Sequence, residues 1–256
     1  GTWTPTTAIS VSPVTNAFTN IAVNPETILG YAVTSSYYAQ ASVFFDLTSM
    51  FTSYSSIKST ARIDDRLYNK INDDDFRKDC FNPTALGDYY SATSEATGFI
   101  PAYTAYKFAA THGLSDDGTD HTGDNQAGAQ EFCQIRLAEV YLMKAEAENS
   151  SNSTSDATNT INALLKARTK AGKTALTFAN YGAGTDLTKF IQLQWRIEMW
   201  GEGGREYFNN KRWGVDVDRA GSTVHTALTT VAGATYPYTK MTLKITQREI
   251  EDNNLC

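Results

Sequence analysis

The stretch "EFCQIRLAEVYLMKAEAE", residues 131–148, constrains the fold more than any other part of the chain, because it predicts a helix with apolar side chains on more than one face. A helix on the surface of a protein needs only one apolar stripe. A helix inside an array of stacked helical hairpins contacts neighbours on two sides and must be apolar on both. We therefore predict a helix over 131–149 in the interior of a mainly α protein.

Charged residues lie among the apolar ones in this predicted helix. Arg136 and Glu139 are three residues apart and Lys144 and Glu148 are four apart, spacings at which an exposed pair contributes about 0.2–0.5 kcal/mol. Ion pairs of this kind are more often structural than catalytic, so we interpret them as helix-surface pairs plus a buried structural bridge. Cys133 is expected to be a small core residue of the same helix.

Two further segments predict helices that pack against the first. Residues 156–171 form an antiparallel hairpin with it and are expected to end at Gly172, and residues 186–202 pack against that hairpin. Each segment has an apolar stripe at helical spacing, formed by Ala157, Ile161, Leu164 and Leu165 in one and by Leu187, Phe190, Ile191 and Trp195 in the other.

The chain before these helices is rich in loops and aromatic residues. Residues 63–81 predict one or two short helices separated by a turn around Asn72–Asp75, and alternating aromatics in 98–110 suit a short strand. We predict a single domain made of a loop-rich region, 1–130, and a helical region, 131–256.

The composition argues against several classes of function. The formal net charge of −6, with 28 acidic and 22 basic residues, is unfavourable for binding nucleic acid, which needs clustered Lys and Arg. The three cysteines have no metal-ligand spacing, and no apolar run is long enough to span a membrane. His112, His121 and His225 stand in no catalytic motif, so we expect neither an enzyme nor a cofactor.

Four motifs occur in the order "IRLAEVYLMKAEAE", "INALLKARTKAG", "RIEMWGEGGREYFNNKRWG" and "MTLKITQREIEDNN". In this order they resemble the C-terminal half of the SusD/RagB family over roughly residues 60–255. Asn209 stands where that pattern usually has Asp, and Thr246 and Asn254 stand where it usually has Pro. The motif residues on the helices resemble packing and ion-pair positions, which implies that they are architectural.

The resemblance implies a SusD-like fold, with tetratricopeptide-type helical hairpins, long irregular loops and minor β structure. It also implies a non-enzymatic surface lipoprotein of Bacteroidetes that captures nutrients, typically oligosaccharides, above a SusC-like TonB-dependent transporter. Such a protein lies on the extracellular face of the outer membrane, held by a lipid anchor outside this sequence. Two alternatives stay open, which are a helical-repeat interaction scaffold without a small ligand and a protein that captures peptides.

Sugar sites in such proteins are expected on loops, because a pyranose face stacks on an exposed ring while Asn, Asp or Arg forms hydrogen bonds with its hydroxyl groups. The aromatic, weakly charged segment 31–54 is the best candidate, with Phe45 and Tyr54 in the same cluster. The alternative is that these rings pack the loops onto the helices. The candidate ligand-binding residues are Tyr37, Tyr38, Gln40, Phe44 and Asp46, with a second platform at Tyr89 and Tyr90.

The loop 116–125 contains a weak candidate for a Ca²⁺ site. Its carboxylates are hard oxygen ligands, but their spacing differs from that of an EF-hand loop, so a solvated turn is the favoured interpretation. The four residues are Asp116, Asp117, Asp120 and Asp124.

Overall fold

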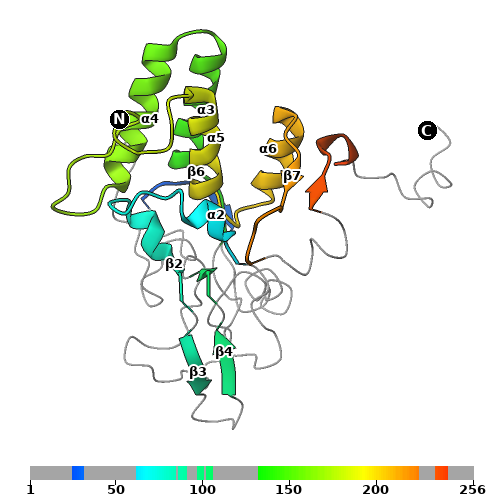
Figure 1. Cartoon of the computed structure of the whole chain (residues 1–256). Coiled ribbons are helices and arrows are strands. Elements are labelled where there is room, and N and C mark those ends of the chain that lie inside the picture. The colour runs from blue at the N-terminus through cyan, green and yellow to red at the C-terminus, as the bar shows by residue number, and fades with distance from the viewer. Residues whose placement is uncertain are drawn as a thin grey trace. The chain divides into compact units, whose positions relative to one another are not determined.

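The computed structural model describes residues 25–31, 62–84, 86–90, 97–100, 102–105, 132–224 and 234–241 (Figure 1). The chain divides into two compact units, Gly1–Gly203 and Gly204–Cys256. Across the described residues the secondary structure is mainly helical, with short two-stranded sheets, as the sequence predicts.

Three helices form the centre of the first unit. Helices α3 (Leu137–Ser150) and α4 (Thr154–Arg168) make a hairpin, and α5 (Leu187–Glu198) also packs against α3. Helix α3 contacts both of its neighbours, as expected of an interior helix. Its fully buried residues Ala138, Leu142 and Ala145 share one face, however, and Met143 is 46% exposed, so two buried apolar faces are not found. The predicted apolar stripes are buried, from Ala157 to Leu165 on α4 and from Leu187 to Trp195 on α5.

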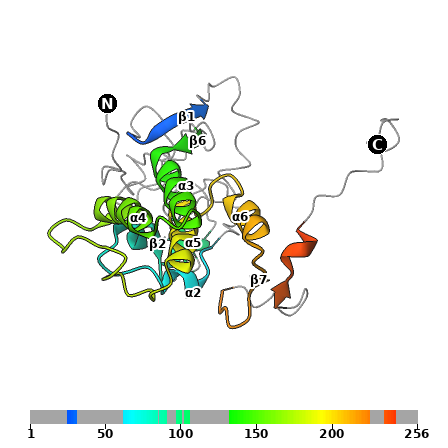
Figure 2. The ribbon, with the colours of Figure 1, turned by 90° about the horizontal axis from the view of Figure 1, so that it is seen from above.

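The start of the first predicted helix is wrong. Residues Phe132–Arg136 form strand β6, which pairs antiparallel with β1 (Thr27–Tyr31), so α3 begins only at Leu137. The Leu137 amide donates to the Glu26 carbonyl oxygen at 2.8 Å, which ties the end of the strand to a distant segment. A short apolar run suits either state, and pairing with β1, which lies more than 100 residues earlier in the sequence, selects the strand (Figure 2). Cys133 is therefore a buried strand residue.

The other helix ends are close to those predicted. The Asp186 side chain accepts a hydrogen bond from the Lys189 amide at 3.1 Å and caps the start of α5. Helix α5 ends at Glu198, four residues before the expected boundary, and α4 ends at Arg168. Gly172 lies beyond that end with a φ of 75°.

The segment before the helices has the predicted pair of short helices. These are α2 (Asp65–Tyr68) and the 3₁₀ helix η3 (Phe76–Cys80), capped by the side chains of Asp64 and Asp75. A core cluster fastens this segment to α5 through Ile63, Ile71, Cys80, Phe81, Leu193 and Ile197.

Short strands complete the described part of the first unit. Strand β2 (Phe81–Asn82) pairs with β5 (Thr104–Ala105), and β3 (Leu86–Tyr90) pairs with β4 (Thr97–Ile100). The strand expected within 98–110 is thus found as the two short strands β4 and β5.

The second unit contains α6 (Arg205–Trp213), β7 (Val217–Asp218), β8 (Thr235–Tyr236) and the 3₁₀ helix η4 (Tyr238–Lys240). Gly214 ends α6 in the left-handed conformation, with a φ of 67°. In the part of the chain that the structure describes, every helix is too short or too polar to cross a membrane.

Candidate binding site

The interior of the first unit holds a network of buried charges centred on Glu198 at the end of α5. Its carboxylate accepts hydrogen bonds from Arg77 at 2.8 Å, from Arg136 at 2.5 Å and from Arg168 at 2.9 Å. The three arginines and Glu198 are each at most 5% exposed. Glu198 therefore joins η3, the end of β6 and the end of α4.

Further acidic groups complete this network. Arg168 donates to Glu26 at 2.8 Å, and Arg136 donates to Glu202 at 2.7 and 2.8 Å. Arg136 is the residue before α3, and its guanidinium reaches acids from distant segments. The sequence predicted a buried structural bridge without placing it. Arg136, which was expected in a helix pair with Glu139, belongs to this buried bridge with several partners.

The electrostatics of the network favour the charged forms of its members. Burial alone would raise the pKa of Glu198, but the guanidinium groups of Arg168, Arg136 and Arg77 hold it well below its ordinary value. Burial alone would lower the pKa of Arg77, and the carboxylates of Asp75 and Glu198 raise it instead. Glu198 and the three arginines therefore stay ionised at neutral pH, which suits a structural role.

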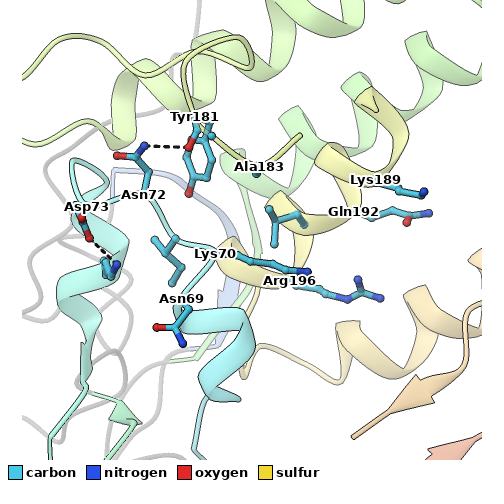
Figure 3. A pocket seen from close by; sticks show the side chains of 13 residues that line it. Asn69, Lys70, Asn72, Asp73, Tyr181, Ala183, Lys189, Gln192 and Arg196 are labelled. Atoms are coloured by element: carbon cyan, nitrogen blue, oxygen red, sulfur yellow. Dashed lines mark hydrogen bonds and ion pairs between the residues drawn. The ribbon is translucent and has the colours of Figure 1, made fainter. Parts of the chain in front are cut away.

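One branch of the network fixes a loop near the protein surface. Asp75 accepts hydrogen bonds from Arg77 and, at 2.8 Å, from the Tyr181 hydroxyl group. The Tyr181 carbonyl oxygen in turn accepts a hydrogen bond from the Asn72 side chain at 3.0 Å (Figure 3). Burial, and to a lesser extent the Asp75 carboxylate, raises the pKa of the Tyr181 hydroxyl group, which is therefore a neutral donor.

A pocket of about 680 Å³ is lined in part by Asn72 and Tyr181 of this branch. Residues 69–73, in the turn after α2, form one wall, and the outer face of α5 forms another. Ile71, Tyr181 and Leu193 are the buried residues of its lining. The volume lies in the range of about 300–1,000 Å³ that is usual for sites of small ligands.

The lining of this pocket is polar and mostly basic. Lys189 and Arg196 project from α5, with Gln192 between them, at spacings of three and four residues that place them on one face (Figure 3). Lys70 reaches the pocket from the opposite wall. Lys78 also lines it and donates to the one acidic lining residue, Asp73, at 2.6 Å. Such a lining can bind an anionic or hydroxyl-rich ligand.

The residues predicted for sugar binding are divided between strand β3 and segments outside the described residues. Tyr89 and Tyr90 lie on β3, where they pair with Gly98 and Thr97 of β4. The candidates of the aromatic segment, Tyr37, Tyr38, Gln40, Phe44 and Asp46, are outside the described residues, as are Asp116, Asp117, Asp120 and Asp124. Within the described ranges, no group of three or more potential metal-ligating side chains is placed to hold a metal ion.

Sequence reasoning missed the pocket and its basic lining. The helical spacing of Lys189, Gln192 and Arg196 was a usable signal, since it puts three polar side chains on the face of α5 opposite its apolar stripe. Nothing in the sequence indicates that Lys70 faces them, because that contact depends on the packing of the turn after α2 against α5.

Comparisons with known proteins agree with this architecture. A model of the SusD family matches residues 25–255. A SusD-like carbohydrate binding protein from Bacteroides vulgatus superimposes with a TM-score of 0.55 and 28% identity, over 79% of this chain and 37% of the other.

Two more distant structures share the fold. A SusD superfamily protein from Bacteroides thetaiotaomicron has a TM-score of 0.60 at 20% identity, over 90% of this chain and 47% of the other. A putative sugar binding protein from Bacteroides vulgatus has a TM-score of 0.60 at 18% identity, over 93% of this chain and 47% of the other. The chain thus spans less than half the length of these structures. No curated protein matches it. The family match covers nearly the whole chain and the fold agrees, so the chain belongs to the SusD family.

Proposed function

We propose that this chain is part of a protein that captures sugars, specifically oligosaccharides, without chemically changing them. The observation that carries this proposal is the match of the SusD family model to residues 25–255. It is supported by the likeness to a SusD-like carbohydrate binding protein at 28% identity. The buried charge network also fits a binding protein, because Glu198 and its three arginines are held in buried structural ion pairs.

The captured sugar is passed to a SusC-like TonB-dependent transporter, with the protein anchored by lipid on the extracellular face of the outer membrane. This part of the proposal rests on family membership. Co-purification of the tagged, full-length protein with outer-membrane proteins of its native cells tests it. Recovery of a TonB-dependent transporter is the expected result, and recovery of the protein without one would contradict the partnership.

The rings that hold the sugar are those of segment 31–54, above all Tyr37 and Tyr38, with Gln40 and Asp46 as hydrogen-bonding neighbours. Stacking of a pyranose on a ring and bonding of its hydroxyl groups need this mixture of side chains. Phe44, Tyr89 and Tyr90 are the remaining candidates for the same role.

Affinity electrophoresis of this chain through gels containing plant, host or microbial polysaccharides tests sugar capture. Retardation by at least one polysaccharide, reversed by its free oligosaccharide, is expected. Migration that no polysaccharide changes, combined with binding to a peptide library, would favour peptide capture. The absence of both would favour a helical-repeat scaffold.

A further inference from the structure

The pocket between the turn after α2 and helix α5 differs in charge from the chain as a whole. The chain has a formal net charge of −6, whereas the pocket is lined by four basic side chains and one acidic one. The acid, Asp73, is already bonded to one of the four, Lys78. The other described lining cations are Lys70, Lys189 and Arg196. Lys189 also pairs at 3.6 Å with Asp186, the exposed residue that caps α5, and the described lining itself holds more basic than acidic side chains.

These three cations come from both sides of the pocket. Lys70 extends from the turn toward α5, while Lys189 and Arg196 lie on the outer face of that helix (Figure 3). An anionic group between the walls would therefore meet positive charge from two directions. A cluster of surface lysines on a single helix would not give this arrangement.

The walls are held in place by buried contacts. Asp75 and Tyr181 fix one end of the turn, and Ile71 packs in the core cluster with Leu193 of α5. Arg77 donates to Gln194 at 2.7 Å and to Glu198 at 2.8 Å, both on α5. A site whose walls are fixed in this way loses little conformational entropy when a ligand binds.

The pocket also offers groups that suit sugar hydroxyls. The amides of Asn69 and Gln192 line it and can each donate and accept hydrogen bonds. Among the lining residues that the structure describes, no aromatic ring lies exposed, because Tyr181 is only 3% exposed. Ligand recognition here must therefore come from charge and hydrogen bonds and cannot come from stacking.

We infer that this pocket binds the acidic group, a carboxylate or a sulfate ester, of an anionic saccharide. The inference rests on the proposed function and narrows it, because it names acidic glycans as the ligand class and the α2–α5 pocket as a site for the charged sugar unit. A hydroxyl-rich acid matches a lining that mixes cations with amides. An acidic peptide would bind only the cations of the lining. Its apolar side chains would find no matching apolar surface in the pocket.

Calorimetric titration of the whole chain with defined oligosaccharides tests this inference. Short oligogalacturonates carry carboxylates only, chondroitin sulfate oligosaccharides carry both acidic groups, and galacto-oligosaccharides serve as neutral counterparts. Binding of one acidic class at least tenfold tighter than the neutral sugars is expected, with a preference that weakens as salt is added. Comparing the affinities for oligogalacturonates and for chondroitin sulfate oligosaccharides shows whether the pocket binds a carboxylate or a sulfate ester.

Variants locate the binding in the pocket. Lys70→Gln and Lys189→Gln change exposed lining residues on opposite walls and should each weaken acidic-glycan binding about tenfold, the loss expected for one charge-assisted hydrogen bond. Lys166→Gln makes the same charge change at an exposed position of α4 outside the lining and should leave affinity unchanged. Unaltered melting temperatures check that the three variants remain folded.

Each other outcome would overturn the inference in a distinguishable way. Equal binding of neutral and acidic sugars leaves the proposed sugar capture intact and refutes the acidic ligand. Equal losses in all three variants would show nonspecific attraction. Binding of an oligo-aspartate peptide with the same lysine dependence, but of no glycan, would assign the pocket to a peptide and would refute the proposed function as well.

Discussion

Arg168 and Glu198 lie 30 residues apart in the sequence, yet their side chains meet at 2.9 Å in the interior of the first unit. The pair joins the last residue of α4 to the last residue of α5. Glu198 also accepts hydrogen bonds from Arg77 and Arg136. One carboxylate at the end of α5 therefore connects this helix to three other elements, which are η3, β6 and α4.

Removing the Glu198 charge should strongly destabilise the fold. Glu198→Gln keeps the shape of the side chain but leaves buried guanidinium groups without their shared partner, and the expected loss is about 3–5 kcal/mol in the free energy of unfolding. Urea denaturation followed by circular dichroism measures it. Glu148→Gln is the control, because Glu148 pairs with the exposed Lys144 and should cost less than about 1 kcal/mol. Similar losses in both variants would refute a special role for the buried network.

Lowering the pH should reduce the stability of the fold through protonation of Glu198. The folded state holds the pKa of Glu198 well below the ordinary value of 4.5, so the unfolded chain takes up a proton first as the pH falls. The stability contributed by this group is full above about pH 4.5 and is lost as the pH falls toward the folded pKa. Melting temperatures measured across this range should fall more steeply for the wild type than for Glu198→Gln. If the melting temperatures of the wild type and of Glu198→Gln fell equally with pH, Glu198 would not be the source of the acid sensitivity.

Raising the pH should reduce the stability of the fold through deprotonation of Tyr181. Its pKa is raised above the ordinary value of 10.0 in the fold, so the unfolded chain releases the proton first. The contribution of this group is full below about pH 10 and is lost as the pH rises through the folded pKa. Tyr181→Phe should cost about 1 kcal/mol at neutral pH through the lost hydrogen bond to Asp75, and it should reduce the alkaline loss. An unchanged alkaline slope in this variant would show that other groups cause the loss.

Truncation of a stacking ring should lower sugar affinity without unfolding the chain. Tyr37→Ala or Tyr38→Ala is expected to cost about 1–3 kcal/mol of binding free energy, since a ring that stacks on a ligand supports little of the core. Tyr236→Ala, which removes an exposed ring of the second unit, is the matched control and should bind normally. Calorimetry and a melting curve on each variant give both quantities. Normal affinity with a sharply lowered melting temperature would identify these tyrosines as packing residues.

Local patterns were sufficient to predict α4 and α5. The apolar stripe from Ala157 to Leu165 and the capping Asp186 depend only on residues within a few turns of helix. The motifs that carry the family resemblance also contain Arg136, Arg168 and Glu198 at their observed network positions. The sequence therefore predicted these residues as architectural.

Local sequence patterns could not predict the contacts between distant segments of the chain. Residues 132–136 follow a helical pattern, but pairing with β1 supplies hydrogen bonds that the sequence window does not contain. Asp75 and Glu26 entered no motif, and only packing brings them to the arginines. The same holds for Lys70, which faces α5 across the pocket because the core cluster docks its turn there.

Calorimetric titration of the wild-type chain with the oligosaccharide released from its best-retarding polysaccharide is the most direct test of sugar capture. The account predicts saturable heat with a defined stoichiometry and an unmodified sugar recovered at the end. The absence of saturable heat with oligosaccharides from every plant, host and microbial source, or recovery of a cleaved product, would contradict it.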